Sequence, residues 1–97
     1  MALDTLTITM GKLGSGEWEL ELQDGETLEV FLDEVEVSEI RGFFARGHNV
    51  ERELLVELTT GTQPGGPIRL RQRKLVDEKW EEVGELADAR KLDRAGT

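Results

Sequence analysis

Apolar and polar residues alternate along most of this chain, and a period of two residues predicts β-strands. The apolar residues of segment 5–10 alternate with threonine, and those of segment 17–22 alternate with glutamate. Each segment therefore has one face suited to a core and one suited to water. The pattern returns over 28–32, 54–58 and 67–75. The alternating apolar residues are Leu6, Ile8, Met10, Trp18, Leu20, Leu22, Leu28, Val30, Leu32, Leu54, Val56, Leu58, Ile68 and Leu70.

The apolar positions change phase within the third of these predicted strands. They are even-numbered up to Leu32 and odd-numbered from Val35 onward. A strand keeps one face buried through such a change only if it contains a bulge or a sharp bend. We therefore predict a strongly bent third strand, with the bend near Asp33 and Glu34.

Glycine, proline and aspartate punctuate the strands and predict their turns. Asp24 and Gly25 lie between two alternating segments, where they favour a tight hairpin because both residues tolerate positive φ. Residues 45–51, ARGHNVE, are predicted as a turn. Residues 59–66 contain three glycines and a proline, which predicts a loop.

The C-terminal segment allows two interpretations. Residues 78–92 are rich in good helix formers, and three of their apolar residues would share one helical face. Gly84, however, destabilises a helix by about 1 kcal/mol relative to alanine. We therefore expect a short strand over 82–89, with a helix as the alternative.

Together these segments predict an all-β fold, namely a small five- to six-stranded antiparallel barrel or sandwich. A chain of 97 residues has the length of one domain. We predict a single β domain over 1–92 and a frayed tail over 93–97.

The segment from Trp18 to Leu75 resembles the Sm-like and other SH3-like small β-barrels. The resemblance lies in a strand, a Leu-x-Asp-Gly hairpin (here Leu22-Gln23-Asp24-Gly25), a long bent strand and a following antiparallel pair. It implies a small-barrel fold. The family's nucleic-acid motifs are missing, because no Asp-x-x-x-Asn follows the bent strand and no Arg-Gly-Asx occurs in the later strands. The resemblance therefore carries no expectation of RNA binding.

Composition excludes several classes of chemistry. The chain has no cysteine and a single histidine, His48, which excludes disulfides, thiolate nucleophiles and multi-histidine metal sites. Glutamates recur at every second residue over 17–21, as on any strand face that is exposed to water. No phosphate-binding glycine loop or serine-protease pattern is present. We expect no enzymatic activity, no cofactor and no metal.

The net charge of −9 bears on the choice of partner. Residues 1–66 carry a net charge of −10 and residues 67–97 a net charge of +1. Strong negative charge opposes binding to nucleic acid and to anionic membranes. No apolar run approaches the roughly 20 residues that span a bilayer, and the first residues lack the features of a signal peptide. We expect a cytoplasmic protein with no membrane partner.

A run of basic residues, which we call the arginine stripe, is the clearest functional candidate. Its members are Arg69, Arg71, Arg73 and Lys74. The three arginines project from one face of a strand and could contact phosphates. Alternatively, segments 52–58 and 67–75 pair antiparallel, and Glu53 and Glu57 face the arginines across the hairpin. Such a pairing predicts that Glu57 is half exposed.

Three apolar residues complete the candidate binding surface. Phe31 and Leu55 are out of phase with the apolar residues around them, and Trp80 follows Lys79. Apolar side chains on the outer face of a strand mark a contact surface when they cluster, whereas in a barrel that is covered on both sides Phe31 and Leu55 would belong to a core. We expect a non-enzymatic acidic interaction module that binds a protein partner or itself, and the alternative is RNA or single-stranded DNA binding through the arginine stripe. The candidate surface comprises Arg69, Arg71, Arg73, Lys74, Phe31, Leu55 and Trp80.

Overall fold

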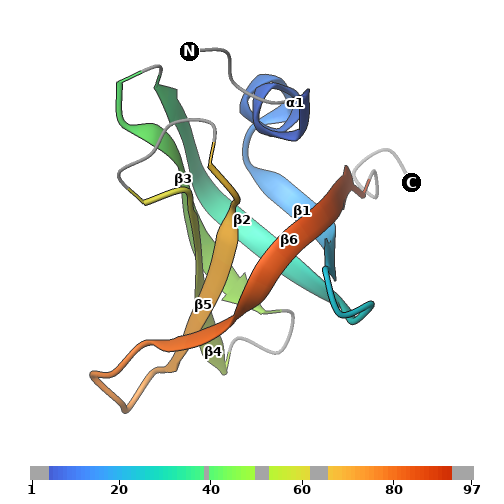
Figure 1. Ribbon diagram of the computed structural model, residues 1–97. Helices are drawn as coiled ribbons and strands as arrows, with labels where there is room; N and C mark the ends of the chain where they lie inside the picture. The colour runs from blue at the N-terminus through green and yellow to red at the C-terminus, as the bar shows by residue number, and fades with distance from the viewer. Residues whose placement is uncertain (1–4, 39, 50–52, 62–65, 93–97) are drawn as a thin grey trace.

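The computed structural model describes residues 5–38, 40–49, 53–61 and 66–92, which form a closed antiparallel barrel with a helix at one end (Figure 1). The elements are α1 (Thr5–Leu13), β1 (Gly16–Leu22), β2 (Thr27–Ser38), β3 (Gly42–Asn49), β4 (Leu54–Thr59), β5 (Arg69–Lys74) and β6 (Glu81–Lys91). Each strand pairs with the next, and β6 pairs with β1. The predicted small antiparallel barrel is confirmed. The predicted tail over 93–97 lies outside the described residues.

The hydrophobic core fills the inside of the barrel and consists largely of the residues that alternate in the sequence. Complete burial of one such side chain contributes about 1.5–3 kcal/mol to stability. The buried apolar residues are Met10, Trp18, Leu20, Leu22, Val30, Leu32, Phe43, Ala45, Val56, Leu58, Ile68, Leu70 and Leu86. Among the described residues, no helix is both long enough and apolar enough to cross a membrane.

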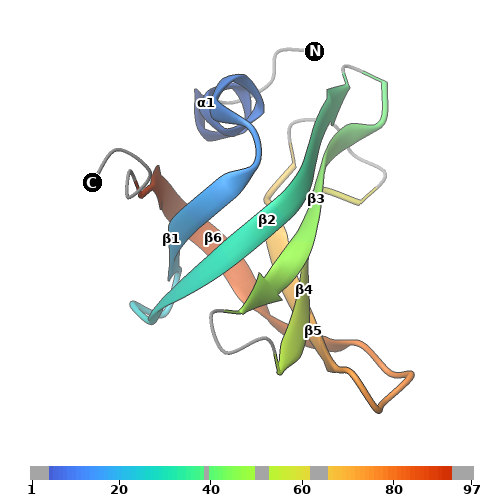
Figure 2. The same cartoon turned by 180° about the vertical axis from the view of Figure 1, so that it is seen from behind.

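Residues 5–13 form the helix α1, so the strand predicted over 5–10 is wrong. Six residues are too few to separate the two periods, because Leu6 and Met10 are also four residues apart, as on one face of a helix. α1 lies across the end of the barrel at which β2 joins β3 (Figure 1, Figure 2), and there it contacts β2 and β6. Thr7 and Met10 are completely buried. The strand predicted to be the third is therefore β2.

The predicted turn over 45–51 is also wrong in its described part, because β3 continues to Asn49. Gly47 lies in the middle of this strand, beside β2. A Cβ atom at Gly47 would overlap the backbone carbonyl of Phe31. Glycine in a strand often marks such a close approach of a second backbone, and here it does not mark a turn.

The pairing of β2 with β3 shifts register between Leu32 and Glu34. This shift falls where the apolar positions of the sequence change phase. Leu32 before it is buried, and Val35 after it packs against the core. One extra residue in β2 therefore lets both Leu32 and Val35 pack on the core, although one position is even-numbered and the other odd-numbered.

The C-terminal segment forms the strand β6, which is the preferred of the two interpretations. Its alternation is imperfect because its pairing shifts register on both sides. Val83 is the extra residue opposite β5, and Ala87 is the extra residue opposite β1. Each shift moves the following side chains to the other face of the strand.

Candidate interaction surface

The predicted hairpin of segments 52–58 and 67–75 is present as β4 and β5. Their antiparallel register runs from Leu54 opposite Lys74 to Thr59 opposite Arg69. This register places Glu57 directly opposite Arg71, as the sequence predicts. Glu53 precedes β4 and is exposed, so it faces none of the three arginines.

Two of the four members of the arginine stripe, Arg69 and Arg71, are neutralised within the chain. Arg71 donates a hydrogen bond to Glu57 on β4. Arg69 instead turns to β6, where its Nη1 lies 3.2 Å from Glu82 and its Nη2 lies 3.8 Å from Glu85. Half of the stripe therefore forms one side of cross-strand ion pairs, and only Arg73 and Lys74, among the described residues of the stripe, keep a positive charge that no carboxylate pairs.

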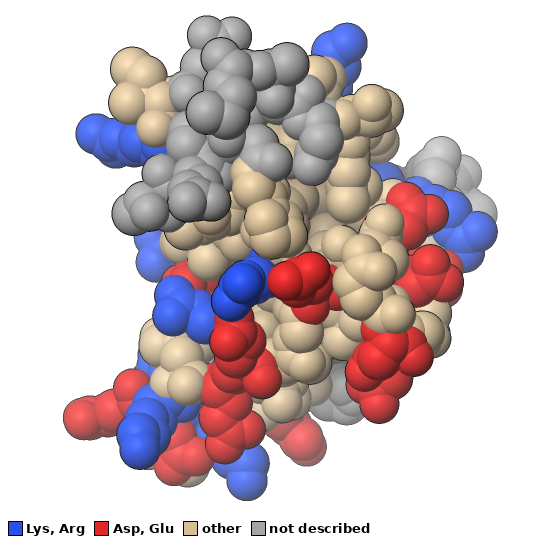
Figure 3. Space-filling model, in the orientation of Figure 1, with Lys and Arg blue, Asp and Glu red and all other residues tan. Residues whose placement is uncertain are grey.

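Acidic and basic residues alternate across five strands, and we call this row the charge ladder. Its members are Glu34, Arg46, Glu57, Arg71 and Glu82, and each is directly opposite the next. Figure 3 shows acidic and basic side chains side by side over β5 and β6, the part of the barrel that faces the viewer. Opposite charges paired across strands contribute about 0.2–1 kcal/mol each and favour one register.

The outer pair of the ladder shows its electrostatic effect. Nε of Arg46 lies 2.9 Å from Oε2 of Glu34. The hydrogen bond from Arg46, and after it the attraction of the opposite charge, lower the pKa of Glu34 and raise the pKa of Arg46. Both side chains are exposed, so solvent screens the pair and it contributes little to stability.

We expect Glu57→Lys to lower the free energy of unfolding by about 2 kcal/mol. The Glu57 side chain is 14% exposed, less than the half exposure predicted from the sequence. The variant would place a third cation between Arg46 and Arg71. Urea denaturation followed by circular dichroism measures the loss. Glu53→Lys is the matched control, and equal losses in the two variants would contradict the role of the ladder.

A second row runs beside the charge ladder, and we call it the aromatic strip. Its members are Phe31, His48, Leu55, Arg73 and Trp80. The first four are directly opposite one another on β2, β3, β4 and β5. The guanidinium of Arg73 then lies 5.3 Å from the centre of the Trp80 ring. The sheet thus aligns four of these side chains from four strands, and the connection between β5 and β6 brings Trp80 beside Arg73.

The rings of Phe31 and His48 stack with their centres 5.5 Å apart and their planes inclined by 11°. Nδ1 of His48 lies 2.8 Å from the carbonyl oxygen of Asn49, which can only accept, so this nitrogen carries the proton. Phe31 is 38% exposed, and Leu55 and Trp80 are half-buried. The strip is therefore an ordered and partly exposed apolar surface outside the core.

The structure brings together Phe31, Leu55, Arg73 and Trp80 of the predicted surface and aligns Arg69 and Arg71 beside them. Lys74 does not join them, because it shares its side of β5 with the buried Leu70. His48 is a member that the sequence analysis missed. The predicted turn at this position concealed the strand that places it between Phe31 and Leu55.

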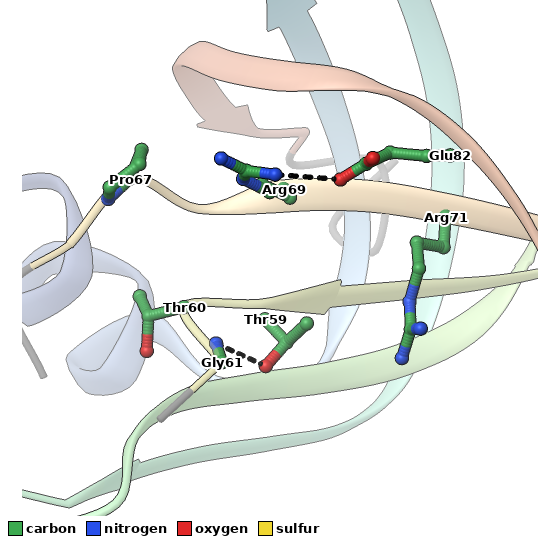
Figure 4. A pocket seen from close by; sticks show the side chains of 7 residues that line it. All are labelled: Thr59, Thr60, Gly61, Pro67, Arg69, Arg71 and Glu82. Atoms are coloured by element: carbon green, nitrogen blue, oxygen red, sulfur yellow. Dashed lines mark hydrogen bonds and ion pairs between the residues drawn. The ribbon is translucent and has the colours of Figure 1, made fainter. Parts of the chain in front are cut away.

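A pocket of about 350 Å³ lies at the Arg69 end of the stripe (Figure 4). We call it the Arg69 pocket. It is lined by Thr59, Thr60, Gly61, Pro67, Arg69, Arg71 and Glu82. In Figure 4 the Arg69 side chain points along the wall toward Glu82 on β6, and the N–H of Gly61 donates to the hydroxyl of Thr59.

No protein-family model, curated protein or solved structure matches this chain. The resemblance to Sm-like and SH3-like barrels therefore stays a sequence-based expectation. The arrangement of surface side chains is the basis for inferring function.

Proposed function

We propose that this barrel is a non-enzymatic protein-interaction module that binds a protein partner or a second copy of itself through the aromatic strip. The supporting observation is the alignment of Phe31, Leu55 and Trp80 across the outside of the sheet. None of the three contributes to the buried core. Clustered apolar side chains on the outside of a small protein are typical of contact surfaces.

The chemistry of the strip suits a protein partner. Tryptophan and arginine are enriched among the residues that dominate binding energy in protein interfaces. The guanidinium groups of Arg73 and Arg71 lie 5.3 Å and 5.9 Å from the centre of the Trp80 ring. These contacts restrict the Trp80 ring and the two arginine side chains before a partner binds. Ordered side chains lose less entropy on binding. The neighbouring charge ladder supplies a polar rim.

We expect Phe31→Ser to abolish association that the unaltered chain shows. The substitution removes the most exposed ring of the strip without opening the core. Sedimentation velocity over a range of concentrations measures self-association. Affinity capture followed by mass spectrometry identifies other protein partners, and circular dichroism confirms that the variant is folded.

Ile8→Ser is the matched control for that experiment. Ile8 is 42% exposed, close to the exposure of Phe31, but it lies on α1. We expect Ile8→Ser to associate as the unaltered chain does. A chain that stays monomeric, and that captures no protein in a manner dependent on Phe31, would contradict the proposal.

One observation supports the second candidate, single-stranded nucleic-acid binding. Among the described residues, Arg73 and Lys74 form no ion pair with a carboxylate, and the Trp80 ring lies beside Arg73. Base-stacking sites combine aromatic rings with such cations. Fluorescence anisotropy with a labelled oligonucleotide at low salt tests this candidate. Arg73→Glu should abolish binding and Arg90→Glu should not, whereas no binding by the unaltered chain excludes the candidate.

A further inference from the structure

We propose that the Arg69 pocket binds a carboxylate group presented by the protein partner that occupies the aromatic strip. This inference rests on the proposed function and adds the chemistry of the partner. Arg69 and Arg73 are four residues apart on the same face of β5, which corresponds to about 13 Å. The partner would therefore carry an apolar side chain and a carboxylate about that far apart.

Two hydroxyl groups line the pocket, and each accepts a hydrogen bond from a backbone N–H. Oγ1 of Thr59 accepts the N–H of Gly61, and Oγ1 of Thr60 accepts the N–H of Phe43, each at 2.9 Å. A hydroxyl group that accepts in this way still has its own proton to donate. Neither hydroxyl donates to another described residue, so both protons are available to an incoming oxygen.

Arg69 supplies the positive charge. Its side chain is half exposed, and so are those of its partners Glu82 and Glu85. Ion pairs between such exposed side chains are weak. An incoming carboxylate can therefore replace Glu82 at the Arg69 guanidinium, and Glu82 regains its hydration. Arg71 stays in place, because its partner Glu57 is much more buried.

The charge of the surroundings favours a carboxylate over a phosphate. A carboxylate adds one negative charge beside Glu82 and Glu85, which is the smallest addition that an anionic ligand can make. A phosphate would bring additional negative charge next to Glu82 and Glu85, in a chain whose net charge is already −9. A carboxylate also matches the planar fork of the guanidinium with two parallel hydrogen bonds.

The experiment is an NMR titration of the ¹⁵N-labelled chain with sodium acetate. Acetate replaces an equal concentration of chloride at each step, so that the ionic strength stays constant. We expect saturable shifts of the Gly61 and Arg69 amides. Arg69→Gln should weaken binding about tenfold, because it removes the charged group that holds the acetate. Glu82→Gln should strengthen binding about threefold, since it removes the internal competitor.

Arg90→Gln is the matched control, because Arg90 forms an equivalent exposed ion pair with Glu19 on the β1–β6 side of the barrel. It should leave acetate binding unchanged. Shifts that do not saturate, or that saturate at the same acetate concentration in Arg69→Gln as in the unaltered chain, overturn the inference. Tighter binding of inorganic phosphate at the same amides overturns the assignment to a carboxylate.

The two proposals fail in distinguishable ways. Association that depends on Phe31 but is unchanged in Arg69→Gln, with no saturable acetate binding, overturns the pocket and supports the proposed function. Saturable acetate binding that Arg69→Gln weakens about tenfold, in a chain that associates with no protein, supports the pocket's carboxylate chemistry and overturns the proposed function.

Discussion

We expect Gly47→Ala to lower the free energy of unfolding by about 3 kcal/mol, at the upper end of the range for overpacking. The new methyl group would overlap the carbonyl of Phe31 and press on the Cα of Leu32. Both contacts are to backbone atoms, so no side-chain rotation relieves them. The strands β2 and β3 would have to separate next to their register shift. Guanidinium unfolding followed by circular dichroism measures the loss.

Gly84→Ala is the control for that substitution. A Cβ atom at Gly84 would meet only Cδ1 of Leu22, at an ordinary contact distance of 3.9 Å. The free energy of unfolding should change by no more than about 0.5 kcal/mol. If Gly47→Ala were as stable as Gly84→Ala, the close approach of β2 to β3 would be wrong. The position of His48 in the aromatic strip would then also be in question.

Trp18→Ala should lower the free energy of unfolding by about 4 kcal/mol. The Trp18 side chain is completely buried and is the largest in the core. Its removal leaves a cavity that the surrounding strands of a closed barrel cannot fill by moving together. Its indole Nε1 also donates a hydrogen bond of 3.0 Å to the carbonyl of Gly14, just after α1. Chemical denaturation followed by circular dichroism gives the size of the effect.

Trp18→Phe removes the hydrogen bond to Gly14 but keeps most of the packing of the ring. We expect a loss of about 1–2 kcal/mol, together with faster hydrogen exchange of the α1 amides, because the link to Gly14 is gone. Trp80→Phe, at a half-buried position in the aromatic strip, should leave the exchange of α1 unchanged. Unaltered protection of α1 in Trp18→Phe would show that this hydrogen bond does not hold the helix.

The strands could be predicted from the sequence wherever a single face is buried along the whole segment. Segments 17–22 and 54–58 are of this kind, because the closed barrel directs every second side chain inward. The same reasoning failed at residues 5–13, where a few alternating positions also fit one face of a helix. Tertiary packing of Met10 against the open end of the barrel decides between the two.

The candidate site was predictable only where it depends on one hairpin. The pairing of Glu57 with Arg71 follows from two strands adjacent in sequence. The pairing of Arg69 with Glu82 depends on a register shift at Val83, and the stacking of Phe31 on His48 depends on Gly47 lying inside a strand. In both cases a local irregularity determines the long-range partner. Alternation alone does not reveal such an irregularity.

The closure of the barrel through β1 and β6 has a consequence for folding. The sheet closes only when β1, the first strand, pairs with β6, the last. These contacts therefore have the largest sequence separation of any strand pair in the barrel. Contacts between residues so far apart in the sequence form slowly, because the entropy of closing the intervening chain opposes them. Before β6 pairs with β1, the backbone groups along the open edge of β1 can pair with a strand of another chain. α1 docks on both β2 and β6, so the first element in chain order reaches its final place only after the last one has done so.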